Sequence, residues 1–469
     1  MGYIFRLGLA RLLLAICFAA GPVASALALP SGFAVQAVID GAAFPSAMAF
    51  TPAGDRLFYT ERFSGKIRIY DTVARTLLPD PFATVEVFTT FEDERGLLGI
   101  APDPSFETNR FVYVFHHPSS DSGRITRFTD VNNVGINPTV VVDSIPAASI
   151  HNGGYIGFGP DGKLYVTVGE NGISSNAQNL SVAPGKIHRL NPGGTIPADN
   201  PFPGSSIWSF GMRNSFGFSF HPVTGSLILS EPGPNMDDEI NRIVKGGNYG
   251  WPTVQGCSGD PSFFDPLLSL TPVVTPNGNL VFSSNRYPSE YLFSLFFGEW
   301  NSGRIRRSIL TGSPDTKAQA PAVFLDSGVV SGVLDLKMGP DGNIWFTTPR
   351  SIRRIIYTLP VILPALASNG TPAIGSKVIL SLLGNPGEEA FLLLSVSGTP
   401  LKKRISLGTI PPLGVSSTVL AVPNDPSLVG KSLMIEGVSV DSSGQGTSTG
   451  PMGLVILGSD PSPSCVDTN

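Results

Sequence analysis

A segment between residues 213 and 251 carries many of the side chains with chemical potential in this 469-residue chain. Asp237, Asp238 and Glu239 follow shortly after the Gly233-Pro234 pair. Carboxylates and main-chain carbonyls on a flexible loop are the oxygen donors that Ca²⁺ prefers. A run of acids is equally typical of a solvated turn. Spacing alone therefore leaves a calcium site and a wet acidic turn as alternatives.

His151 offers a different chemistry, because an imidazole with an ordinary pKa near 6.5 can accept a proton close to neutral pH. It precedes the turn residues Asn152-Gly153-Gly154 and an apolar strand. A histidine just before a strand is also often a hydrogen-bonded structural residue. The choice between these two interpretations depends on the elements that surround it.

Those elements are predicted by a pattern that recurs along residues 48–357. Alternating apolar residues lead into a tight turn, an apolar strand and a strand that often begins Gly-Arg/Lys-Ile. The turns are Pro52-Ala53-Gly54, Pro102-Asp103, Pro160-Asp161-Gly162, His221-Pro222 and Pro340-Asp341-Gly342, while the fifth copy, around Tyr291 to Phe297, lacks one. Six units spaced roughly 50 to 65 residues apart predict a six-bladed β-propeller over residues 29–358. The strand at residues 33–39 is expected to complete the last blade and remove its open edge.

The chain beyond the repeat is expected to form a separate β domain. Residues 359–369 are proline-rich and predict a linker, and residues 370–458 contain short strands typical of a small immunoglobulin-like β-sandwich. Residues 459–469 are expected to be a flexible tail unless Cys465 anchors them. The fold class is therefore all-β, a propeller followed by a sandwich.

The N-terminus predicts an exported protein, periplasmic or extracellular. Arg6 and Arg11, the apolar residues 12–20 and Ala26-Leu27-Ala28 form the three parts of a signal peptide over residues 1–28. No later run is long and apolar enough for a transmembrane segment. Cys257 and Cys465 remain after cleavage, and whether they pair is left open by their distance in sequence. The net charge of −5 argues against nucleic acid as a partner.

Several motifs, in order along residues 33–357, resemble the soluble quinoprotein (PQQ-dependent) glucose/sorbosone and aldose sugar dehydrogenases. They are Glu94-Arg95-Gly96-Leu97-Leu98-Gly99, His151-Asn152-Gly153-Gly154, Gly185-Lys186-Ile187, Arg213-Asn214, Glu231-Pro232-Gly233-Pro234-Asn235-Met236-Asp237-Asp238-Glu239-Ile240-Asn241 and Lys245-Gly246-Gly247-Asn248-Tyr249-Gly250-Trp251-Pro252. The last two are the most specific, because the turn motifs are shared by several propeller families.

The resemblance implies roles for individual residues. His151 would be the general base that takes the proton of the sugar hydroxyl. Arg213 and Asn214 would lie over the quinone and stabilise developing negative charge, with Glu94 in the same cofactor site. The carbonyls of Gly233 and Pro234 would hold the Ca²⁺ that polarises the quinone.

A second, structural calcium site is implied for Asp238, Glu239 and the carbonyl of Tyr249. The implied activity is oxidation of the C1 hydroxyl of an aldose to a lactone, by hydride transfer to pyrroloquinoline quinone. The implied partners are a small sugar and an external electron acceptor.

The sequence departs from the family pattern where basic side chains hold the carboxylates of the quinone. Asn301 stands at the blade-five position and Leu334 at the blade-six position, and Ile150 precedes His151 where the glucose enzymes carry an acid. A buried tricarboxylate needs charge partners. A calcium-stabilised propeller without catalytic activity, acting as a binding module, is therefore one alternative. A lactonase-type propeller hydrolase is a second.

Overall fold

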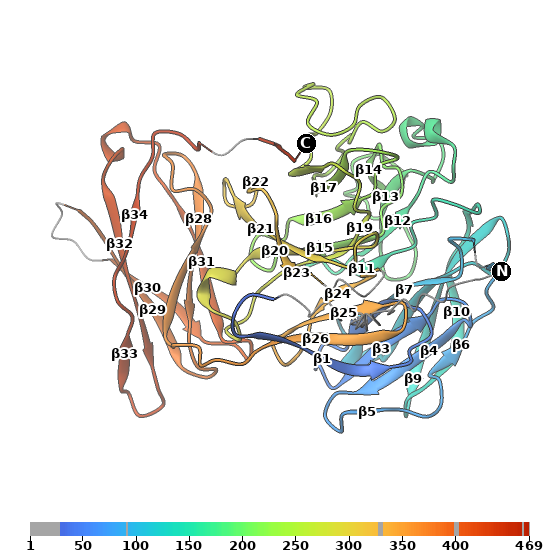
Figure 1. Cartoon of the computed structure of the whole chain (residues 1–469), viewed down its shortest axis with the longest axis horizontal. Helices are drawn as coiled ribbons and strands as arrows, with labels where there is room; N and C mark the ends of the chain where they lie inside the picture. Colours follow the sequence, from blue (N-terminus) through green and yellow to red (C-terminus); the bar gives the residue numbers. More distant parts are fainter. Residues whose placement is uncertain (1–28, 91, 327–331, 398–402, 462–463, 469) are drawn as a thin grey trace, which may run out of the picture.

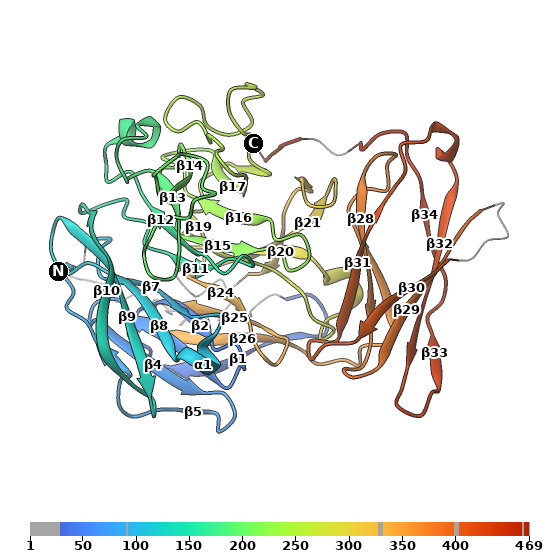
Figure 2. The same ribbon diagram turned by 180° about the vertical axis from the view of Figure 1, so that it is seen from behind.

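The computed structural model describes residues 29–90, 92–326, 332–397, 403–461 and 464–468. The predicted signal peptide, residues 1–28, lies outside the described residues. Figure 1 shows sheets of residues 33–357 on one side and the sheets of the C-terminal part, coloured orange to red, on the other; Figure 2 shows the same arrangement from behind.

Within the described part of the chain, residues 33–357 form six antiparallel sheets in chain order. The first is β2 (Pro45–Phe50), β3 (Arg56–Glu61), β4 (Lys66–Asp71), β5 (Thr76–Leu77) and β6 (Ala83–Thr84). The second is β7 (Leu97–Pro102), β8 (Phe111–His116), β9 (Ser122–Val131) and β10 (Val134–Pro146), with the short helix α1 (Phe106–Asn109) between β7 and β8. The third is β11 (Ile156–Phe158), β12 (Leu164–Val168), β13 (Lys186–Leu190) and β14 (Ile207–Phe210), with the 3-10 turn η1 (Ser174–Gln178).

The remaining three sheets follow the same plan. The fourth is β15 (Gly217–Phe220), β16 (Leu227–Glu231), β17 (Asp238–Ile243) and β18 (Leu268–Leu270). The fifth is β19 (Pro276–Val281), β20 (Ser294–Glu299), β21 (Ile305–Thr311), β22 (Lys317–Ala318) and β23 (Ala322–Leu325), with the 3-10 turn η2 (Ser289–Tyr291). The sixth is β24 (Leu336–Met338), β25 (Ile344–Thr348) and β26 (Ser351–Tyr357), with β1 (Phe33–Asp40) as its outer strand.

The prediction that the N-terminal strand completes the last sheet is confirmed. β1 pairs antiparallel with β26, from Phe33 opposite Tyr357 to Asp40 opposite Ser351. The first strands of all six sheets line one central cavity of about 460 Å³, to which Phe50, Ile100, Phe158, Phe218 and Leu280 contribute. Loops that leave the same end of these inner strands are therefore brought close together, although they are far apart in sequence.

The C-terminal part forms two further sheets in the described residues. One is β27 (Ala365–Asn369), β28 (Lys377–Leu383) and β31 (Val415–Ala421). The other is β29 (Glu389–Val396), β30 (Lys403–Thr409), β32 (Ser432–Val440), β33 (Gly446–Ser448) and β34 (Met452–Val455), and the 3-10 turn η3 (Pro426–Leu428) precedes β32. The expected linker is shorter than residues 359–369, because residues 365–369 contain no proline and pair as β27 with β28.

The C-terminal segment is anchored to the fourth sheet. Cys257 and Cys465 form a disulfide, and β35 (Val466–Asp467) pairs parallel with β18. Whether Cys257 and Cys465 pair, which the sequence left open, is thereby settled. The C-terminal segment is held by the disulfide and by the pairing of β35 with β18. No helix among the described residues is long and apolar enough to cross a membrane.

Candidate active site

His151 lies in the turn that leads into β11, with a positive φ of 58°. Its carbonyl accepts hydrogen bonds from the main-chain and side-chain nitrogens of Asn171, at 3.0 and 3.1 Å. Gly169 makes this approach possible, because a Cβ at that position would lie 2.3 Å from the same carbonyl oxygen. The turn that carries the imidazole is thus held against the end of β12.

The imidazole of His151 pairs with a carboxylate. Nδ1 lies 2.5 Å from Oε1 of Glu170, whose side chain is 3% exposed, while that of His151 is 14% exposed. A carboxylate only accepts hydrogen bonds, so Nδ1 carries the hydrogen and Nε2 is left with a free lone pair. Sequence analysis does not single out Glu170; its signal is the Gly169-Glu170-Asn171 run directly after an apolar strand.

Glu94 joins this histidine to the neighbouring loop. Its Oε2 accepts hydrogen bonds from the main-chain nitrogen of His151 at 2.6 Å and from Nδ2 of Asn214 at 3.0 Å. The amide oxygen of Asn214 accepts in turn from the nitrogen of Gly153 at 3.1 Å. The structure therefore brings together Glu94, His151 and Asn214, which the sequence placed in one site.

Arg213 is fixed beside them by a buried carboxylate, Glu231. Oε1 of Glu231 accepts from the main-chain nitrogens of Arg213 and Asn214, both at 2.6 Å, and Oε2 accepts from the hydroxyl of Ser215. Burial raises the pKa of Glu231, and these hydrogen bonds oppose the shift. The Arg213 carbonyl accepts from the nitrogen of Glu170 at 2.8 Å, which connects this loop to the His151 pair.

The predicted calcium ligands lie next to this network. Nη1 of Arg213 donates to the carbonyl of Pro232 at 3.1 Å, and the nitrogen of Gly233 donates to Oδ1 of Asp238 at 2.6 Å. The Pro232 carbonyl, which directly precedes Gly233 in the chain, therefore lies beside the Arg213 guanidinium.

The expected second calcium site is not gathered in the described residues, which hold no group of three or more His, Cys, Asp or Glu side chains suited to a metal ion. Oδ2 of Asp238 accepts from the nitrogens of Val274 and Thr275. The oxygens of Glu239 accept from Gly256 and Asn241, and burial raises the pKa of Glu239 to about 8. Donors of the protein itself therefore occupy both carboxylates.

A cavity of about 310 Å³ opens beside this network. Glu94 and Gly153 line it, and His151 and Asn214 are hydrogen-bonded to Glu94. Arg213, Gly233 and Pro234 are not among its lining residues. The walls combine aromatic and polar side chains: Phe44, Ser46, Arg62, Glu92, Asp93, Glu94, Leu98, Gly153, Tyr155, Phe216, Thr275, Asn277, Trp300 and Leu334. Four aromatic walls and a few polar groups are typical of a site for a small planar or ring-shaped ligand.

The family model described as "Glucose / Sorbosone dehydrogenase" matches residues 42–356. The chain belongs to the glucose/sorbosone dehydrogenase family. The resemblance drawn from the motifs is confirmed, and the matched residues carry the whole network around His151.

Relatives with a stated activity support the same assignment. The chain is 32% identical to quinoprotein glucose dehydrogenase B of Acinetobacter calcoaceticus over 52% of this chain and 57% of that one. It is 27% identical to the aldose sugar dehydrogenase YliI of Escherichia coli over 71% of this chain and 94% of that one. The solved PQQ-bound aldose sugar dehydrogenase of Streptomyces coelicolor is 29% identical, with a TM-score of 0.61 over 70% of this chain and 99% of that one.

The cavity of this family member contains the two positions where basic residues were expected. Leu334 lines it, as does Trp300, which directly precedes Asn301. Arg95, Arg304 and Arg306 do not replace the missing cations, because each is already paired: Arg95 with Asp93, Arg304 with Asp326, and Arg306 with Glu299. The basic side chain that does line the cavity, among the described residues, is Arg62, which the sequence analysis missed.

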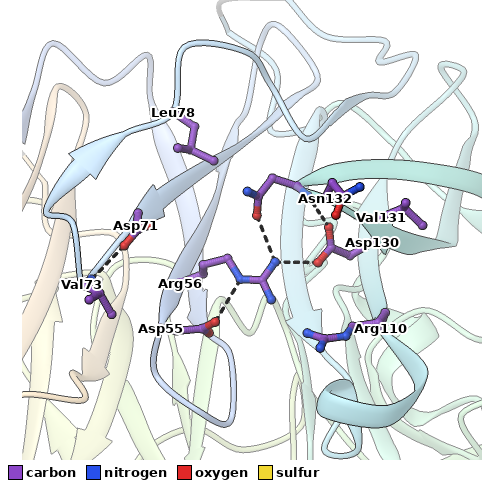
Figure 3. A pocket seen from close by; sticks show the side chains of 10 residues that line it. Asp55, Arg56, Asp71, Val73, Leu78, Arg110, Asp130, Val131 and Asn132 are labelled. Carbon is purple, nitrogen blue, oxygen red and sulfur yellow. Dashed lines mark hydrogen bonds and ion pairs between the residues drawn. The ribbon is translucent and has the colours of Figure 1, made fainter.

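A larger cavity, of about 590 Å³, lies between the first and second sheets (Figure 3) and has a different character. Its central side chain is Arg56, which lies 2.5 Å from Asp130 and 3.4 Å from Asp55 and donates to Asn133 at 3.1 Å. Arg56 is therefore already paired with acids of the protein, and it connects the two sheets rather than serving as a binding group for a ligand.

Proposed function

We propose that this chain is an exported, PQQ-dependent sugar dehydrogenase that oxidises the C1 hydroxyl of an aldose to a lactone. In this proposal the six sheets are blades of a propeller, and the C-terminal sheets form an immunoglobulin-like sandwich. The observation that carries the proposal is the His151–Glu170 pair, tied through Glu94 to Asn214 and through the Glu170 nitrogen to Arg213.

The pair is suited to remove a proton. Glu170 holds Nδ1 and stabilises the imidazolium that forms, so Nε2 of His151 can take the proton of a sugar hydroxyl. Glu170 is itself buried, and one of its oxygens, Oε2, has no hydrogen-bond partner among the described residues. The hydrogen bond to His151 is therefore the only one that this carboxylate forms with the described residues, and it fixes the orientation of the imidazole.

The other half of the oxidation is the loss of a hydride from C1. No amino-acid side chain accepts a hydride, and the quinone supplies that acceptor when it is bound. The guanidinium of Arg213 lies where it can stabilise negative charge beside the Gly233-Pro234 carbonyls, which would hold Ca²⁺. The aromatic side chains of Phe44, Tyr155 and Trp300 line the adjacent cavity and would limit the access of water to a bound ligand.

The residues that line the cavity fit an anionic quinone in one specific respect. Arg62 is among them, and its terminal guanidinium nitrogens have no hydrogen-bond partner among the described residues. The second calcium site stays a prediction without support from side-chain clustering. The sugar itself and the external electron acceptor follow from the family and belong to the proposal.

The test is reconstitution of the purified protein with Ca²⁺ and pyrroloquinoline quinone, followed by dye reduction with a panel of aldoses. Sugar-dependent dye reduction is the expected result. Quinone binding without turnover, or no quinone binding at high micromolar concentration, would favour a calcium-stabilised binding module. Hydrolysis of a lactone in the absence of quinone would favour the hydrolase.

A further inference from the structure

Arg62 directly follows β3 and lines the 310 Å³ cavity. Its Nε donates to the carbonyl of Arg95 at 3.0 Å. Neither terminal nitrogen has a hydrogen bond to a described residue, Nη2 is buried without a partner, and no described carboxylate forms a salt bridge with the guanidinium. This side chain therefore has donors to spare at the cavity wall.

Two other buried arginines of these sheets are each paired with a carboxylate. Arg95 is bound by Asp93, and Arg56 is bound by Asp130, as Figure 3 shows. A buried guanidinium without its full set of acceptors costs free energy. The rings of Phe44 and Phe63, at 5.3 and 4.9 Å from the Arg62 guanidinium carbon, offset part of that cost but accept no strong hydrogen bond.

The nearby acids do not fill the vacant donors. Asp93 is held by Arg95, and Oε2 of Glu94 is held by His151 and Asn214. Their charges attract Arg62 only at a distance, and burial lowers its pKa against that attraction. An incoming acceptor would find the guanidinium oriented by Arg95 and by the two rings.

The same cavity is bordered by Trp300 and Leu334, at the places where sequence predicts cations and none is found. We propose that Arg62 binds a carboxylate group of the planar anionic cofactor in this cavity and takes over the charge neutralisation expected near Asn301 and Leu334. This inference rests on the proposed quinone function. Glu92, Asp93 and Glu94 line the cavity as well, so a carboxylate would be attracted by Arg62 and repelled by these acids, which would restrict the orientations open to the ligand.

The experiment titrates the full-length apoprotein with pyrroloquinoline quinone at saturating Ca²⁺ and follows binding by tryptophan fluorescence and equilibrium dialysis. Losing a charge-assisted hydrogen bond should weaken binding by about tenfold or more in Arg62→Ala. Arg62→Lys keeps the charge and should recover part of the affinity, and Arg62→Gln should not. Arg124→Ala is the matched control, because Arg124 pairs with Asp143 outside this cavity, and its affinity should equal that of the wild type.

Wild-type affinity in both Arg62→Ala and Arg62→Gln would overturn the inference while leaving the proposed function intact. Failure of the wild type to bind quinone would instead overturn the proposed function, and the inference with it. A third outcome identifies another source of the carboxylate. If the Arg62 variants bind quinone as tightly as the wild type but have a higher KM for a uronic acid and not for the neutral aldose, Arg62 binds a sugar acid. The assignment of Arg62 to the quinone carboxylate is then wrong.

Discussion

The sheets of residues 33–357 and the C-terminal sheets bury different kinds of side chain. Glu231, Asp238, Asp335 and Lys186 are among the charged residues buried in the first region. The C-terminal sheets bury Asn369 and several serines as polar groups, but no charged side chain in their described part, around an aliphatic core that includes Leu380 and Ile435.

This difference indicates that the first region carries a cost in folding stability for the sake of its function. Burying a charge is costly unless it is paired or fully hydrogen-bonded. An aliphatic core of the C-terminal kind stabilises a fold without that cost. Retaining so many buried charges in the first region is consistent with a binding or catalytic site there and a mainly structural role for the second region.

The largest predicted effect is on turnover, and it tests the first half of the comparison. His151→Ala should lower kcat by roughly 10²–10⁴-fold, because the general base is lost. The unfolding temperature should also fall, because the buried carboxylate of Glu170 would lose its partner, so turnover is compared at a temperature at which circular dichroism shows the variant to be folded. Ser381→Ala, in β28 of the C-terminal region, is the control and should leave kcat unchanged. Wild-type rates in His151→Ala would remove this residue from the mechanism.

The second prediction concerns the aliphatic core. Leu380→Ala should lower the free energy of unfolding of the C-terminal sheets by about 2–5 kcal/mol, because a buried leucine leaves a cavity. Hydrogen exchange should speed up in residues 365–457, while the affinity for quinone stays constant. A matching loss of quinone affinity at temperatures where the protein is folded would contradict the separation of the two regions.

The third prediction concerns the disulfide that connects the fourth sheet to the C-terminal segment. Replacing Cys257 and Cys465 together by serine should destabilise the protein by about 2–4 kcal/mol, since the disulfide restricts the unfolded chain. The disulfide also lies next to Gly256, whose nitrogen donates to Glu239. Calorimetry of the double variant provides the measurement, and hydrogen exchange at residues 254–258 reports whether the loop loosens. An unchanged unfolding temperature would show that β35 and the docked sheets suffice.

The smallest effect per residue is a dependence of stability on pH. All five histidines lie between residues 116 and 221, and burial lowers the pKa of His116, His117, His188 and His221, that of His188 to about 4. The unfolded state binds the proton more readily, so stability is full above pH 6.5 and falls as the pH decreases towards 4.

His188 alone should cost about 2 kcal/mol between pH 7.5 and pH 5. Urea unfolding at the two pH values measures the loss, and His188→Gln should reduce it. The C-terminal sheets, which contain no histidine, should show the smaller change in hydrogen exchange. Equal acid sensitivity of both regions would argue against buried histidines as the cause.

Strands, turns and family could be predicted from the sequence because their signals are local. Alternation of apolar residues, turn residues such as Pro160-Asp161-Gly162 and the motif around Gly233 each depend on neighbours in the chain. The same motifs placed His151, Arg213 and Asn214 in one site.

Only the tertiary structure decides which polar and charged groups form hydrogen bonds or ion pairs with one another. Glu170 is the partner of His151, main-chain donors occupy Asp238, and Arg62 is left with free donors at a cavity wall. Such pairings depend on distances of a few ångströms between loops of different sheets, which sequence spacing does not encode. Hydrogen bonds and ion pairs fall off steeply with distance and angle, so the availability of a charge for a ligand follows from the folded arrangement.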